Sequence, residues 1–226
     1  MSDLPTTRQA QSESGSCGSP QKIMERLRES TRELHNQAEG HEFQKLLGGG
    51  KVAVDQYITY LEQLLVIHRT LAQELEKAGS RPVEAIVEAR HTNLDSLHLD
   101  LGHFQKSPET AEPLPSTRKF LEELKATAQA DPAALLGYLY VLEGSTNGAR
   151  FMARTLREGL ALPQSAGATY FDRYGPSQRE YWMDFKARMN ELELSPEQQE
   201  KIIETAKATF QIFFDMGEEI LERAKT

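Results

Sequence analysis

The residues near the start of the chain that are best suited to chemistry are a histidine, two arginines and a glutamate. Arg28, Arg32, His35 and Glu39 are spaced by four, three and four residues, which puts them along one helix face. His35 can bind iron through a neutral imidazole, while Glu39 accepts the other ring N–H and fixes the tautomer. An iron porphyrin with two propionates would require such a set. The alternative is a solvated charged face that carries a histidine by chance.

A second candidate segment, 142–149, has two glycines four residues apart with polar residues between them. Gly144 and Gly148 interrupt a long helical pattern, and each costs roughly 1 kcal/mol relative to alanine in a helix interior. Their spacing predicts a kink, or a close approach of the backbone to something flat. A loop between two shorter helices would explain the same residues, and spacing alone does not decide between them.

Other motifs give weaker indications. His68 lies among core-facing aliphatic residues, where a histidine is more often a buried core residue than a functional one. His91 and His98 share a helix face, but no third ligand follows at helical spacing, so we expect no zinc site. The sequence has a single Glu-x-x-His pair, Glu88 with His91, whereas a di-iron carboxylate bundle uses two. It has no phosphate loop, dinucleotide fingerprint or nucleophile elbow.

The elements that must position these residues are expected to be helical throughout. Apolar residues recur at helical spacing from Pro20 onward, without strand-like alternation. Ser19, Asp131 and Ser195 each precede a proline and indicate helix starts, whereas glycines indicate ends. We therefore expect one all-α domain of about seven helices, at 20–39, 54–78, 82–99, 116–130, 132–158, 177–192 and 196–224.

Composition limits the class of protein. A chain of 226 residues suits one domain with a sizeable core, and a net charge of −8 argues against a nucleic-acid partner. Residues 2–19 hold one large aliphatic residue, so we expect a disordered tail at 1–19 and a folded domain at 20–226. One cysteine and the lack of any long apolar run favour a cytoplasmic protein without a membrane anchor.

Three segments resemble the heme oxygenase family. Residues 28–39, Arg-Glu-Ser-Thr-Arg-Glu-Leu-His-Asn-Gln-Ala-Glu, are similar to the family's proximal helix, which carries the iron ligand. Residues 185–210 resemble the C-terminal helix pair, and 140–149 resembles the distal helix of the bacterial branch. The resemblance runs from about residue 22 to residue 222. It implies a single-domain bundle that holds heme between the first helix and a glycine-kinked distal helix.

The resemblance also implies roles for individual residues. His35 matches the proximal iron ligand and Glu39 its hydrogen-bond acceptor. Gly144 and Gly148 match the glycines whose backbone lies over the heme. Four basic residues would bind or lie near the propionates: Arg28, Arg32, Lys186 and Arg188.

On the distal side, His68 and Ser145 would hold ordered water that delivers protons. Animal members carry an acidic residue where Ser145 stands, which changes the group that orients the water. Phe210 corresponds to a wall of the heme pocket. Either Tyr138 or Tyr140 would face the heme edge, because the alignment of the distal helix can slip by one residue.

The implied reaction is the cleavage of heme b, with dioxygen, to biliverdin, carbon monoxide and ferrous iron. The electrons would come from a ferredoxin or a flavoprotein, NADPH-dependent reductase, since the sequence has no flavin or nicotinamide motif. One rival is a non-catalytic heme-storage or heme-sensing protein on the same fold. Another is a related helical enzyme with a non-heme metal or a thiamin-type substrate, which predicts a core cluster of carboxylates and histidines.

Overall fold

A computed structural model describes residues 21–223 and residue 225, and the elements in this part are all helical. The tail expected at 1–19 lies outside the described residues. The α-helices are α1 (Ile23–Gly40), α2 (Glu42–Gly48), α3 (Val54–Lys77), α4 (Arg81–Ile86), α5 (Ala89–Thr92), α6 (Asp95–His103), α7 (Pro115–Ala130), α8 (Leu135–Gly159), α9 (Gln178–Glu191) and α10 (Pro196–Arg223). Short 3-10 helices are η1 (Pro108–Thr110), η2 (Pro132–Ala134), η3 (Tyr170–Asp172) and η4 (Gly175–Ser177).

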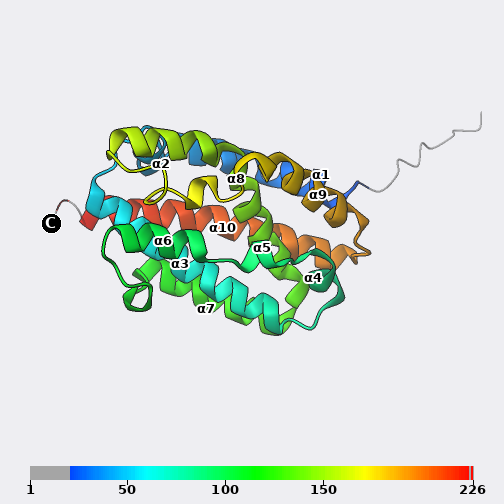
Figure 1. Ribbon diagram of the computed structural model, residues 1–226. Helices are drawn as coiled ribbons and strands as arrows, with labels where there is room; N and C mark the ends of the chain where they lie inside the picture. Colours follow the sequence, from blue (N-terminus) through cyan, green and yellow to red (C-terminus); the bar gives the residue numbers. More distant parts are fainter. Residues whose placement is uncertain (1–20, 224, 226) are drawn as a thin grey trace, which may run out of the picture.

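The C-terminal helix α10 runs through the middle of the bundle (Figure 1). It packs against α1 and α8 on one side and against α3 and α7 on the other. Its fully buried residues Ile202, Ala206 and Met216 lie in the core. The apolar stripe of α10 therefore joins the two halves of the bundle, as expected for a helix that is apolar on one face.

Helix α1 buries one stripe and leaves the opposite face exposed. Ile23, Leu27 and Thr31 recur every four residues and are buried, and the Thr31 hydroxyl donates to the Leu27 carbonyl at 2.8 Å. His35 continues the same spacing but is exposed. The helix thus carries His35 beyond the region where α1 is covered by the core.

The distal helix α8 is continuous through Gly144 and Gly148, so the alternative of a loop is wrong. The side chains of Ser145, Thr146 and Asn147 each donate to the carbonyl three residues earlier, at 2.7, 2.6 and 2.8 Å. Hydrogen bonds of this kind often bend helices. The ribbon of α8 changes direction along its length (Figure 1), as expected for a kinked helix.

Two expectations about the elements were wrong. The helix expected at 82–99 is three short helices, α4 to α6, because Val87 and Asn93 adopt extended backbone. Side chains stabilise these breaks: the backbone N–H of Glu88 donates to His91 Nδ1, and that of Asp95 donates to Asn93 Oδ1. Helix α2 was not expected, because seven residues between glycines carry too short a pattern.

Candidate active site

A cavity of about 630 Å³ lies between α1 and α8. Thr31, His35 and Ala38 of α1 form one wall, and residues 140–152 of α8 contribute the opposite one. Phe210 and Phe213 of α10 also line it. Residues of α2 and α9, which lie toward opposite ends of α1 in Figure 1, also contribute. Residues of α3 and of 170–173 complete the lining. The volume is in the range of sites for cofactors and drug-sized ligands.

His35 is the histidine that lines this cavity. Its side chain is 60% exposed, and its Nδ1 lies 3.7 Å from a carboxylate oxygen of Glu39, which also lines the cavity. The edge of the imidazole approaches Phe210, with ring centroids 6.2 Å apart. The structure thus brings His35, Glu39 and Phe210 together at one cavity wall, with the imidazole free of any buried partner.

Gly144, Ser145 and Gly148 line the opposite wall. A Cβ atom added at Gly144 would meet only the Trp182 ring, at 3.5 Å, and one added at Gly148 would meet no atom within 4 Å. Packing within the protein therefore does not require glycine at either position. What both glycines do is keep side chains out of the cavity.

The structure separates the two candidate tyrosines. Tyr140 lines the cavity and packs on Trp182, with ring centroids 6.0 Å apart. Burial raises the pKa of Tyr140, while a hydrogen bond to Thr31 and the charge of Arg28 lower it. Tyr138 instead packs against Phe120 of α7 and does not line the cavity.

The four residues expected to bind or lie near the propionates have different surroundings in the structure. Arg28 and Arg32 are exposed on α1 beyond the cavity lining, and Arg28 is close enough to act on Tyr140. The Lys186 ammonium lies 5.8 Å from the centre of the Trp182 ring, which does line the cavity. Arg188 points elsewhere: it pairs with Glu88 and donates to the Ala85 carbonyl. Its assignment to the propionates does not fit this geometry.

His68 does not line the cavity itself. It is buried, and its Nε2 lies 2.7 Å from the hydroxyl of Tyr170, which does line the cavity. Burial, and then the charge of Arg173, lowers the pKa of His68 to about 3, so the ring is neutral at physiological pH. His68 can therefore influence the cavity through Tyr170.

Sequence reasoning missed several polar residues of the lining, among them Lys45, Tyr170 and Arg173. Lys45 belongs to α2, the helix that was not expected. Tyr170 and Arg173 lie in and just after η3, a segment without helical periodicity. The one available indication was composition: a basic residue among three aromatic ones at 170–174 in a region otherwise rich in small residues.

The described part of the chain holds no group of three or more His, Cys, Asp or Glu side chains arranged to bind a metal ion. The core cluster expected for the thiamin-type or non-heme rival is thus not found there. Within the same residues, no helix is both long enough and apolar enough to cross a membrane.

The heme oxygenase family pattern matches residues 21–219. The chain belongs to the heme oxygenase family. It is 29% identical over 212 residues to human heme oxygenase 1, which covers 90% of this chain and 73% of that protein. It is 27% identical over 210 residues to the bovine protein, covering 89% and 72%.

Solved structures confirm the all-α fold of the family. Heme oxygenase-2 from Synechocystis, solved with heme and NO, superposes with a TM-score of 0.85 at 20% identity, covering 91% of this chain and 87% of that one. Heme oxygenase-1 from the same cyanobacterium, solved with heme, gives 0.82 at 18%, covering 91% and 96%. A TenA homologue from P. horikoshii gives 0.64 at 15%, covering 89% and 99%. Since these identities are low, the superpositions show the fold alone.

Proposed function

We propose that this protein is an active heme oxygenase that binds heme between α1 and α8 and cleaves it to biliverdin, carbon monoxide and ferrous iron. One observation carries the proposal. The exposed imidazole of His35 shares a cavity of about 630 Å³ with the side-chain-free backbone of Gly144 and Gly148 on the opposite helix. A metal ligand on one wall and an unobstructed opposite wall are what a flat, iron-containing substrate requires.

The remaining lining also suits such a substrate. Aromatic rings of Tyr140, Trp182 and Phe210 offer apolar contact for a macrocycle. Arg28 and Lys186 lie near the Tyr140 and Trp182 end, where they can bind propionates by charge-assisted hydrogen bonds. By holding the propionates, these cations would set the rotation of heme and hence the carbon at which the ring is cut.

Heme supplies the iron that activates dioxygen and is itself the substrate. His35 would bind the iron as a neutral imidazole, a ligand that pushes less electron density toward O–O cleavage than a thiolate does. Gly144 and Gly148 leave room above the ring. The Tyr170 hydroxyl, backed by His68, would hold water there by hydrogen bonds and present a proton to the distal side.

The electrons would come from a separate protein, a ferredoxin or an NADPH-dependent flavoprotein reductase, because the sequence contains no flavin-binding or nicotinamide-binding motif. We propose a cytoplasmic setting for this exchange.

Hemin titration followed by turnover tests the proposal. Purified protein is titrated with hemin while the Soret band is recorded, and NADPH with ferredoxin and its reductase is then added under air. We expect one hemin per chain and the appearance of biliverdin. Stoichiometric hemin binding without biliverdin, with this donor and with ascorbate alike, would identify a heme-storage or heme-sensing protein instead.

A further inference from the structure

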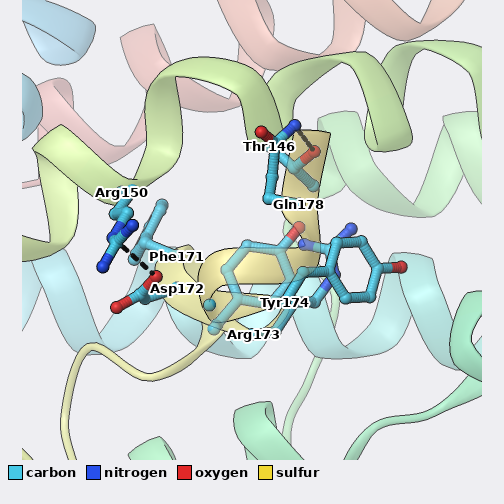
Figure 2. Close-up of a pocket in the computed structure, with 9 residues that line it drawn as sticks. Thr146, Arg150, Phe171, Asp172, Arg173, Tyr174 and Gln178 are labelled. Atoms are coloured by element: carbon cyan, nitrogen blue, oxygen red, sulfur yellow. Dashed lines mark hydrogen bonds and ion pairs between the residues drawn. The ribbon is translucent and has the colours of Figure 1, made fainter. Parts of the chain in front are cut away.

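A second, much smaller hollow lies behind the distal wall of the main cavity. It has a volume of about 10 Å³, room for about one water molecule, and is enclosed by η3, η4 and the facing parts of α8 and α9. Figure 2 shows its polar lining, in which Gln178 donates to Thr146 at 3.1 Å and Arg150 pairs with Asp172 at 3.5 Å. Arg150 is 67% exposed, so the hollow reaches the surface beside it.

The two hollows share a wall. Tyr170, Phe171 and Arg173 line both the small hollow and the main cavity. Of these three residues only Arg173 is charged, and its pKa is raised by Tyr170, Glu143 and Tyr174 despite burial, so it stays protonated. A permanent positive charge thus lies between the surface and the distal side of the main cavity.

Arg173 is held there by buried partners. Its guanidinium lies 3.2 Å from a carboxylate oxygen of Glu143, and the two side chains are only 10% and 6% exposed. The same carboxylate oxygen accepts a hydrogen bond from Tyr174 at 3.0 Å. The guanidinium also stacks on the rings of Tyr170 and Tyr174, 4.8 Å from each centroid.

An ion pair this deeply buried contributes little to stability compared with an apolar pair of the same shape. The presence of this ion pair at a cavity wall therefore suits a role in binding polar groups better than a role in packing. Arg173 cannot give up its proton, but its N–H groups can orient water and its charge can stabilise a negative charge in the cavity.

We propose that Arg173, held by Glu143, is a positioning residue that orients water between the small hollow and the distal side of the main cavity, so that protons reach the distal side through this wall. Because the distal side is defined by where heme binds, this inference rests on the proposed function. Tyr170 lines the main cavity, and His68 lies behind it, 2.7 Å from its hydroxyl. His91 also feels the charge of Arg173, after the larger effects of burial, Arg90 and Arg188 on its pKa.

The test uses the pH at which the spectrum of the ferric heme complex changes from its acid to its alkaline form. The alkaline form carries one more negative charge on the distal side, so a nearby cation favours it. Arg173→Met should raise the transition pH by about one unit, and Glu143→Gln, which leaves the cation unpaired, should lower it by a similar amount. Arg90→Met is a matched control, because Arg90 also stacks on a tyrosine and pairs with carboxylates but lines neither hollow.

Opposite shifts in the two variants, with Arg90→Met unchanged, would support the proposal. Transitions that stay at the wild-type pH, or that move in the same direction, would overturn it. If Arg173→Met does not fold, Glu143→Gln decides alone: a lower transition pH supports the proposal, and an unchanged or higher one overturns it.

Turnover separates this inference from the proposed function. In an active enzyme, Arg173→Met should slow biliverdin formation about tenfold and increase its solvent isotope effect, with hemin affinity unchanged. Opposite spectral shifts in the two variants, together with a wild-type protein that makes no biliverdin, would overturn the proposed function while supporting the placement of Arg173. If the wild type forms biliverdin and the variants keep its transition pH and its rate, the inference is overturned and the proposed function stands.

Discussion

The two walls of the heme oxygenase cavity are built differently. The α1 wall comes from one helix, and its His35 and Glu39 are exposed side chains four residues apart. The distal wall combines α8 and η3 with His68 of α3 behind them, and its residues His68, Glu143 and Tyr170 are buried. Its contacts join residues far apart in the chain, such as His68 with Tyr170 and Glu143 with Arg173. A wall made from one helix follows helical spacing, whereas a wall made from several segments depends on how they pack.

The largest effect is expected on the α1 wall, from His35→Ala. Since the imidazole is 60% exposed and packs only at its edge, the apoprotein should keep its circular dichroism spectrum and melting temperature. Biliverdin formation should fall at least 100-fold, because the iron loses its ligand. Undiminished turnover without added imidazole would remove His35 from the proposed role.

On the distal wall, Gly148→Leu should reduce turnover by about tenfold or more while leaving the apoprotein as stable as the wild type, or more so. A Cβ at Gly148, which lines the cavity, meets no atom within 4 Å, and replacing glycine by alanine within a helix favours folding by roughly 0.5–1 kcal/mol. Apoprotein melting and biliverdin rates measure the two effects.

Gly137→Ala in the same helix is the control for Gly148→Leu. Its Cβ would come within 2.0 Å of the Ile202 carbonyl oxygen, so the apoprotein should melt at a lower temperature. Full activity in Gly148→Leu would place that position away from heme.

A third prediction concerns the pH dependence of stability, which the buried distal residues should dominate. The pKa of His68 is lowered to about 3 in the folded protein, against about 6.5 when unfolded. Below pH 6.5 the unfolded chain therefore binds a proton that the folded chain does not, and stability falls as the pH falls. At pH 5 the loss from His68 is about 2 kcal/mol.

His68→Gln should remove the contribution of His68. The free energy of unfolding, measured with urea, should then differ less between pH 7 and pH 5 for the variant than for the wild type. His91 has a similarly lowered pKa and remains in the variant, so part of the dependence persists. Equal pH dependence in wild type and variant would show that His68 is already accessible to protons in the folded state.

The smallest effect is expected from two cations near the cavity, Arg28, which is exposed, and Lys186, which is half-buried. Arg28→Ala combined with Lys186→Ala should weaken hemin binding about tenfold, a modest change because charges in contact with water are screened. A loosened orientation should also yield more than one biliverdin isomer by chromatography. Arg188→Ala serves as the control and should change neither, since Glu88 and the Ala85 carbonyl hold it elsewhere. Unaltered affinity and a single isomer in the double variant would shift the assignment to Lys45.

These differences explain how far the sequence alone could be interpreted. Long periodic helices such as α3, α7 and α10 were expected to within two residues, and the capping box of Ser195 with Gln198 is present. The periodicity of apolar residues predicted one helix at 82–99, and this was wrong because the side chains of His91 and Asn93 accept hydrogen bonds from the backbone and interrupt the helix there. Arg173 could not be found this way, because its role depends on Glu143 thirty residues earlier.

The hydroxyl and amide groups of Ser145, Thr146 and Asn147 have a consequence for motion. Carbonyls at the middle of an ordinary helix lose their only partners when the helix opens, which makes bending costly. In α8 three successive carbonyls, those of Leu142, Glu143 and Gly144, accept bonds from side chains belonging to the same turn. Because each of these bonds joins groups of one turn, a change in the angle of the helix need not break them. Under the proposed function, α8 could then move as a planar substrate enters and an open-chain product leaves.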